Sequence, residues 1–314
     1  MLVNLLAKRN FFIQIFIIIL FSILGATNFN SIYLSNLEII GLSLSFLTIG
    51  YVVYIDSDNE LISKSSYTTW FYILWMMPFM VQLLDYKMAG SLLLVTYITS
   101  KLIYFETDQS KTFEAFDIGV FLGFTILLNP PLFILGLVVF TYFLTLKGID
   151  SSIIILAILG LLVPLLVFVQ ISYLLDFNFL IDYYQKALSF NFFEFDIKQI
   201  FLVPIVIFAI VAFANFLINA NKESVHVKRV FLLLHLMLIS LILICVLYGG
   251  AEIKFLCFFG ILFMIIFTKY FANKKPHMNW LKETILWSYL VCMLFYNFYD
   301  RIPRIYSLIT EVSF

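Results

Sequence analysis

The sequence predicts an all-α fold, a polytopic transmembrane helical bundle that forms one domain over residues 1–314. Hydrophobic residues make up 63% of the chain, charged residues only 12%, and the mean hydropathy is +1.05. A soluble domain carries about 25% charged residues, and no polar stretch here is long enough to form one. The formal net charge is zero, which gives no basis for binding nucleic acid.

About eleven apolar runs follow one another along the chain, and each is a candidate span. They lie at residues 10–25, 36–54, 67–84, 88–105, 115–129, 131–147, 151–174, 198–218, 229–248, 252–272 and 280–297. A helix needs about 20 residues to cross a bilayer, so several of these runs are short. Lys8 and Arg9 precede the first run, but no Ala-x-Ala site follows it. A retained first span is therefore predicted, and not a cleaved signal.

The distribution of basic residues predicts the orientation of the chain. With Lys8 and Arg9 in the cytoplasm and eleven alternating crossings, 13 of the 19 Lys and Arg residues lie inside and 6 lie outside. This bias is the one that the positive-inside rule describes. If residues 113–147 made a single crossing, the counts would become 10 and 9. The sequence thus predicts a multi-pass membrane protein with a cytoplasmic N-terminus.

Residues 113–147 contain two short apolar runs joined at Asn129, Pro130 and Pro131. Proline has no amide donor, and the residue before a proline avoids the helical region. The stretch therefore predicts a tight helical hairpin whose turn lies at a membrane face. The alternative is a re-entrant loop whose tip stays inside the bilayer, where protein or water must satisfy its backbone. The charge count fits both.

The first half of this hairpin contains a carboxylate and two glycines. Gly119 and Gly123 are four residues apart, a spacing that allows close contact between helices. Asp117 lies just inside the same run, and a carboxylate within a membrane is by default a functional candidate. The alternative is that Asp117 lies at the interface and only caps the helix.

The longest connection between runs, residues 176–197, is predicted to lie on the outer face. Its apolar side chains fall on one helical stripe, formed by Phe177, Leu180, Ile181, Tyr184 and Leu188. Its polar side chains fall on the other, formed by Asn178, Asp182, Gln185, Lys186 and Ser189. This pattern predicts an amphipathic helix in the outer interface, followed by the aromatic-rich stretch 191–196. Such a segment anchors a protein to the membrane; a lid over a lipid-linked substrate is the alternative.

The common catalytic patterns are absent from the sequence. There is no phosphate-binding loop of the Gly-x-x-x-x-Gly-Lys type and no Gly-x-Ser-x-Gly motif. The three histidines, His226, His235 and His277, have no His, Cys, Asp or Glu at the third or fourth position after them, so no helical metal pair is predicted. We therefore expect no cofactor and no metal.

The candidate site residues follow from the predicted topology. The weak catalytic candidates are the outer carboxylates Asp176, Asp182, Glu194 and Asp196. The candidates along a substrate path are Asp117, Asn129, Gln170 and His235. Multi-pass glycosyltransferases of the C type usually carry an acid in the first outer loop, but the corresponding loop here, residues 26–35, has none.

The chain resembles an uncharacterised domain-of-unknown-function family of multi-pass inner-membrane proteins from Bacteroidota. The resemblance rests on Phe116-Asp-Ile-Gly119, on Leu122-Gly-Phe124, on the proline turn and on the pattern of spans. It implies an inner-membrane location and no established activity. Some members carry a carotene-monooxygenase label, but a non-haem iron site needs clustered histidine ligands, which three scattered histidines do not supply.

Three functions remain open from the sequence. The first is a non-catalytic component of cell-envelope assembly, with membrane lipids and other inner-membrane proteins as partners. The second is an enzyme or flippase that handles lipid-linked glycan from the outer face, resembling a C-type glycosyltransferase or a polymerase. The third is a transporter of small solutes. A polar cavity near the 176–197 segment would favour the second, and a cavity at mid-depth would favour the third.

Overall fold

The computed structural model describes residues 2–29, 33–58, 65–105, 112–146, 151–175, 177–219, 223–250, 254–272 and 279–301. All regular secondary structure in these ranges is helical, in thirteen α-helices and several short 3-10 turns. The first seven α-helices are α1 (Leu2–Leu6), α2 (Phe11–Ala26), α3 (Asn36–Asp58), α4 (Tyr67–Met76), α5 (Tyr86–Tyr104), α6 (Thr112–Leu128) and α7 (Phe133–Thr145). The others are α8 (Ser151–Leu175), α9 (Phe177–Ala187), α10 (Val203–Asn219), α11 (Val225–Tyr248), α12 (Phe259–Ala272) and α13 (Asn279–Phe298).

The apolar runs of the sequence coincide with these helices or with helices extended by a 3-10 turn. Five such segments are long and apolar enough to cross a membrane: Asn36–Ile55, Ser151–Leu174, Ile197–Asn219, Val225–Tyr248 and Lys254–Ala272. Phe11–Ala26 and Pro130–Thr145 are shorter apolar helices. A protein with several such helices fits a membrane, while the number of eleven crossings stays a prediction.

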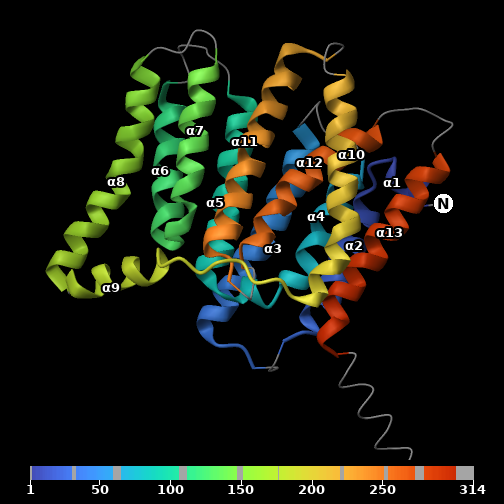
Figure 1. Ribbon diagram of the computed structural model, residues 1–314, viewed down its shortest axis with the longest axis horizontal. Coiled ribbons are helices and arrows are strands. Elements are labelled where there is room, and N and C mark those ends of the chain that lie inside the picture. Colours follow the sequence, from blue (N-terminus) through green and yellow to red (C-terminus); the bar gives the residue numbers. More distant parts are fainter. Residues whose placement is uncertain are drawn as a thin grey trace, which may run out of the picture.

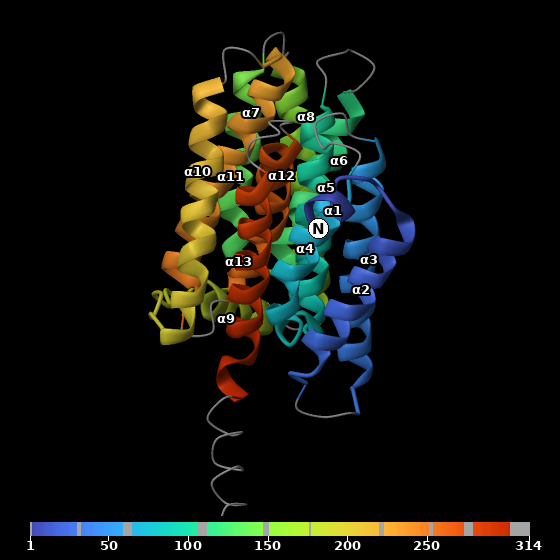
Figure 2. The same ribbon diagram turned by 90° about the vertical axis from the view of Figure 1, so that its right-hand side faces the viewer.

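Consecutive long helices run up and down in turn (Figures 1 and 2). One end of the bundle therefore contains the Pro130–Pro131 turn, helix α9 and the segment that follows α9. We call this end the turn end. Helix α1 and the start of α4 lie away from the turn end, part-way along the bundle (Figures 1 and 2), where the backbone amide of Ser66 donates to the carbonyl oxygen of Leu6 at 2.9 Å.

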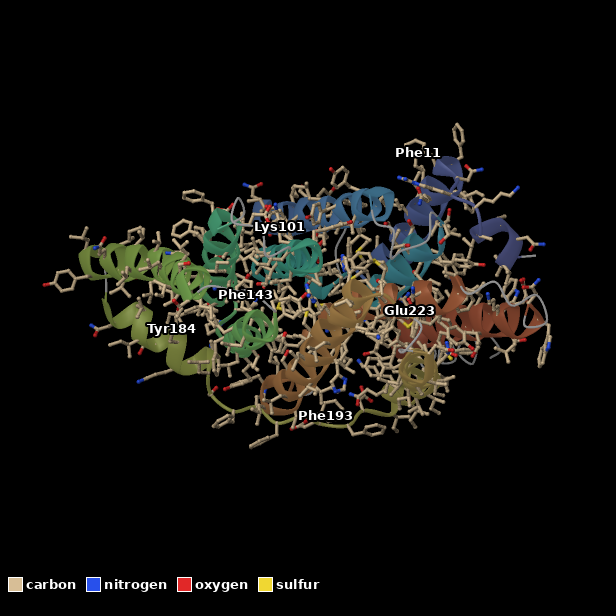
Figure 3. All side chains as sticks on the ribbon, turned by 90° about the horizontal axis from the view of Figure 1, so that it is seen from above. Phe11, Lys101, Phe143, Tyr184, Phe193 and Glu223 are labelled. Atoms are coloured by element: carbon tan, nitrogen blue, oxygen red, sulfur yellow. The ribbon has the colours of Figure 1, made fainter. Side chains whose placement is uncertain are left out.

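Helix α4 lies at the centre of the bundle, because every residue from Tyr67 to Met76 is buried. Its Trp75 indole donates to the carbonyl oxygen of Leu256 at 2.9 Å. The ring of Phe71 packs edge-on against Phe267 and Tyr289. Buried aromatic pairs of this kind add to the packing energy of a core, so α4, α12 and α13 form one aromatic core. Figure 3 shows the contrast between Phe143, within the bundle, and Phe11, at its rim.

The outward sides of the peripheral helices are apolar. The large exposed side chains include Phe12 and Phe16 on α2, Leu162 and Leu166 on α8, Ile207 and Ile210 on α10, and Ile239 and Ile242 on α11. A water-soluble protein rarely exposes apolar patches of this extent. This apolar belt therefore fits contact with lipid.

Helices α6 and α7 are joined by a short turn at Asn129, Pro130 and Pro131. Asn129 is extended (φ −139°, ψ 93°), and Pro130 and Pro131 start a 3-10 turn, η4 (Pro130–Leu132). Neither proline can donate to the last carbonyl groups of α6, so the helix must end there. The turn lies at the turn end, level with α9 (Figure 1), and both the two-pass hairpin and the re-entrant loop stay predictions.

Helix α8 packs against α6 along a seam of small residues, with the backbones in close contact. A Cβ atom on Gly119 would meet the carbonyl oxygen of Ala157, and one on Gly160 would meet that of Phe116. A Cβ atom on Gly123 would meet the ring of Pro164. The predicted role of Gly119 and Gly123 in close helix contact is therefore confirmed, and the contacting helix is α8.

The short helix α1 is fastened to α13. The backbone amides of Leu2 and Val3 donate to the two carboxylate oxygens of Glu283, at 2.8 and 3.0 Å. The hydroxyl of Tyr67 donates to the carbonyl oxygen of Val3 at 2.9 Å. A carboxylate at the N-terminal amides of a helix is favourable, because these amides have no partner within the helix.

Candidate functional site

A cavity of about 770 Å³ lies at the turn end of the bundle. Its walls come from segments far apart in the sequence: the end of α2, the turns after α4, the start of α5, the turns before α10 and α12, and the end of α13. The lining residues are Asn28, Phe29, Pro78, Phe79, Val81, Gln82, Asp85, Met88, Lys198, Lys254, Tyr296, Asn297 and Arg301. Its volume lies within the range of about 300–1,000 Å³ that is common for small-molecule sites.

Among the described residues that line this cavity, most of the charged side chains are cations. Lys198, Lys254 and Arg301 contribute three positive charges, and Asp85 contributes one negative charge. Lys198 also lies 3.5 Å from the carboxylate of Asp196. The carboxylate of Asp85 caps α5 by accepting the backbone amide of Lys87 at 2.9 Å, so part of its charge is balanced by the helix N-terminus.

Two amide side chains fix one wall of the cavity. The Asn28 side chain donates to the side-chain oxygen of Asn297 at 2.7 Å. The Asn297 side chain donates to the carbonyl oxygen of Leu24 at 3.4 Å. These bonds join the ends of α2 and α13, and Asn297 is only 5% exposed. The polar groups at this wall are therefore held in position by the bundle itself.

An extended segment, residues 188–196, leads from α9 to the cavity, and we call it the aromatic strap. Its Phe190, Phe192 and Phe195 side chains are each more than 60% exposed. The backbone amides of Asn191 and Phe193 donate to the carbonyl oxygens of Leu247 and Val246, at 2.9 and 3.1 Å. These carbonyl groups lie in the last turn of α11, so no later residue of the helix donates an amide hydrogen to them. The strap thus caps α11.

The far side of this cap is closed by a glycine. The amide of Gly250 donates to the carbonyl oxygen of Asn191 at 3.0 Å, and Gly250 has φ +55°. A side chain in this left-handed conformation is strained, and a Cβ atom here would also meet the Asn191 side chain. The strap is therefore held to the end of α11 through the amides of Asn191 and Phe193 and through the carbonyl oxygen of Asn191. It does not have the form of a free lid. Figure 3 places Phe193 at the edge of the bundle.

Helix α9 is attached to the proline turn by Tyr183. Its hydroxyl lies 3.2 and 2.8 Å from the carbonyl oxygens of Leu127 and Leu128 and donates to them. Pro130 and Pro131 have no amides to offer the end of α6, so the Tyr183 hydroxyl takes the place of these donors. Burial raises the pKa of Tyr183 to about 12, so the hydroxyl keeps its proton at neutral pH. The ammonium group of Lys87 lies 4.4 Å from the centre of the same ring.

Replacing Tyr183 with phenylalanine should loosen α9 from the turn end. The ring and its contact with Lys87 remain, but the carbonyl groups of Leu127 and Leu128 lose their donor, at a cost of about 1–3 kcal/mol. We expect faster amide hydrogen exchange in residues 177–187 than in the unmodified protein. Tyr173→Phe is the control, because Tyr173 is 77% exposed. Equal exchange in both variants would contradict this role for Tyr183.

The comparison with family models gives a match over residues 1–306, to the family described as "Family of unknown function (DUF6427)". The chain belongs to this family. The resemblance to an uncharacterised domain-of-unknown-function family, inferred from the sequence, is thus confirmed. No curated protein and no solved structure matches the chain.

Among the described residues, the predicted catalytic carboxylates of this DUF6427 protein lie on α9 and on the aromatic strap. Asp182 on α9 and Glu194 on the strap are exposed to the surroundings of the bundle. Asp196 is half-buried and faces Lys198 at 3.5 Å. Asp176 lies outside the described residues. Within the described ranges no three His, Cys, Asp or Glu side chains come together as metal ligands.

Three of the four residues predicted along a substrate path are exposed at the surface of the bundle, and the fourth, Asn129, is hydrogen-bonded to α5. Asp117, on the second turn of α6, and Gln170, on α8, are exposed. His235 of α11 is also exposed, and its ring stacks on Phe213 with 5.2 Å between the centres. The side-chain amide of Asn129 donates to the carbonyl oxygen of Lys87 at 3.0 Å and to the hydroxyl of Ser91. It therefore joins the proline turn to α5 and has a structural role.

In the sequence, the cations of the cavity indicate only the orientation of the chain. Lys198, Lys254 and Arg301 each stand beside the end of an apolar run, and all three were predicted to lie on the outer face. That shared placement is the signal that points to a common site. The three residues lie in separate segments, so no local pattern in the sequence joins them.

Proposed function

We propose that this DUF6427 protein is an integral protein of the bacterial inner membrane and a non-catalytic component of a cell-envelope assembly. The observation that carries the proposal is the position of α8. This 25-residue helix lies at one side of the bundle (Figure 1), and only 22% of its apolar window is buried. Its contacts with the bundle run along α6.

The free sides of α8 suit the transmembrane helix of another protein. They carry large aliphatic side chains, among them Ile155, Ile158, Leu162, Leu166 and Val167, each at least 40% exposed. Association of helices within a membrane depends on van der Waals packing between such surfaces. A helix held on one side only leaves this surface open to a partner, with lipid as the alternative occupant.

Site-specific photo-crosslinking in cells of the native host tests this proposal. A photoreactive residue at Leu166 of α8 should give one discrete adduct with another membrane protein. The matched control is Ile207 of α10, which is similarly exposed, 56% against 57% for Leu166, but lies on a different flank. If both positions give only lipid adducts, or the same mixture of proteins, the proposal fails.

The second candidate is an enzyme or flippase that handles lipid-linked glycan, and the polar cavity at the turn end is the observation that favours it. Asp85 is the acid among its described lining residues, so it would serve as the base. Asp85→Asn should then abolish function in a growth assay, whereas an assembly component should tolerate this change. The third candidate, a transporter, gains no support from the exposed positions of Asp117, Gln170 and His235.

The orientation is part of the proposal. We place the turn end on the outer face and α1 on the cytoplasmic side, following the bias of Lys and Arg residues. A cysteine introduced at the exposed Ser189, within the strap, should then react in intact cells with a reagent that does not cross the inner membrane. A cysteine at Ser224, at the start of α11, should not react until the membrane is opened, and the reverse order would refute the orientation.

A further inference from the structure

We infer that the 770 Å³ cavity at the turn end is a binding site for a phosphate-bearing anion. This goes beyond the proposed assembly role, which needs no ligand. Lys198, Lys254 and Arg301 line one cavity from three segments that are far apart in the sequence. Arginine suits two-pronged recognition of phosphate, and lysine acts as a point charge on it. With Asp85 in the lining and Asp196 at 3.5 Å from Lys198, these described charged groups sum to one positive charge, which favours an anion.

The turns that carry these cations are anchored. Lys198 belongs to η5 (Ile197–Leu202), next to Gln199, whose backbone amide donates to the carbonyl oxygen of Asp196 at 2.9 Å. Gln199 is only 5% exposed, and its side chain donates to the carbonyl oxygen of Glu194 at 3.3 Å. The charge of Lys198 is therefore presented by a fixed turn, and a site that is already ordered loses less entropy on binding.

The other two turns are fixed by the aromatic core. Lys254 starts η7 (Lys254–Phe258), which Trp75 holds through the carbonyl oxygen of Leu256. Arg301 ends η9 (Tyr299–Arg301), where the ring of Tyr299 lies 5.9 Å from that of Phe201 in η5. The core helices and the η5 turn thus set the positions from which the three cations reach the cavity.

The surroundings of the cavity indicate where such an anion would come from. The aromatic strap, with exposed Phe190, Phe192 and Phe195, leads directly into η5 and Lys198. Exposed aromatic side chains at the end of a transmembrane bundle mark the depth of the lipid head groups. The apolar walls at Phe29, Pro78 and Met88 suit the part of a lipid next to its phosphate. A phospholipid head group and a free phosphate share this chemistry, and the experiment separates them.

Binding should be measured on the full chain, purified in detergent and also in nanodiscs of neutral lipid. One arm titrates inorganic pyrophosphate, followed by the thermal shift. The other arm adds phosphatidic acid and counts retained lipid by native mass spectrometry. The test variant is Lys254→Gln with Arg301→Gln. The matched control is Lys186→Gln, an exposed cation of α9 at the same end that does not line the cavity.

We expect the double variant to bind at least about tenfold more weakly than the unmodified protein, because each charge-assisted bond to phosphate is worth about a factor of ten. Lys186→Gln should bind as the unmodified protein does. Loss in the lipid arm alone identifies a lipid head group, and loss in the pyrophosphate arm identifies a free anion; both support the site. Equal binding by all variants, or an equal loss in Lys186→Gln, overturns it. Size-exclusion profiles and circular dichroism show that each variant is folded.

Discussion

Replacing Gly119 with alanine should destabilise the protein by about 1–3 kcal/mol, the usual cost of forcing an extra group into a packed interior. The new methyl group would overlap the carbonyl oxygen of Ala157 and approach the backbone nitrogen of Leu161 to 2.9 Å. Backbone atoms in two helices cannot rotate aside as a side chain can, so α8 must move away from α6. Leucine at the same position should have a larger effect.

The chain offers a control for this substitution with the same chemical change. Gly50 lies in α3, and a Cβ atom there would meet nothing within 4 Å. Because alanine is a better helix former than glycine by about 1 kcal/mol, Gly50→Ala should leave the protein as stable or more stable. Thermal unfolding in detergent, followed by circular dichroism, measures both. Similar shifts in the two variants would show that the seam between α6 and α8 is not as tight as described.

Replacing Trp75 with alanine should cost about 3–5 kcal/mol, as for other large aromatic residues removed from a core. Trp75 is 2% exposed, and its ring packs edge-on against Phe263 with 4.8 Å between the centres. The cavity left behind removes dispersion contacts whether the surroundings are water or lipid. We expect the variant to aggregate on extraction or to unfold at a much lower temperature.

A second variant separates the packing of Trp75 from its hydrogen bond. Trp75→Phe keeps most of the ring but leaves the carbonyl oxygen of Leu256 without its donor, at a cost of about 1–3 kcal/mol. Trp287→Ala is the matched control, because Trp287 is 50% exposed. We expect the unfolding temperature to be highest for Trp287→Ala, lower for Trp75→Phe and lowest for Trp75→Ala. A low unfolding temperature for Trp287→Ala would show that this side chain contacts something outside the bundle.

The helical segments could be predicted because the long apolar runs of this chain are also the stretches that must fold as helices. Long apolar stretches leave their backbone groups only one another as partners, so the stretches fold as helices. The run 67–84 does not form one continuous helix. It contains α4 and two 3-10 turns, η1 (Met77–Phe79) and η2 (Gln82–Leu84). Pro78 lies in the first of these turns, and proline disrupts a helix interior.

The amphipathic helix α9 was also predictable, since its stripe repeats with the period of a helix. The candidate site was not, for a physical reason. Lys198, Lys254 and Arg301 come together only through the packing of α10, α12 and α13, and no spacing along the chain records that packing. The sequence predicts Asp182 and Glu194 as candidates because the topology puts them on the outer face. Amphipathic segments turn such side chains outward, which explains their exposure.

The hydrogen bonds between α1 and the Glu283 carboxylate limit the order in which the chain can fold. Val3 and the carboxylate that it donates to are 280 positions apart, and α4 packs on α12, which is also made late. The ribosome therefore delivers the first helix and the central helix long before their partners exist. Until α12 and α13 emerge, the buried aromatic side chains of α4 must be sheltered by the insertion machinery or by lipid, and truncated chains should be cleared by proteolysis.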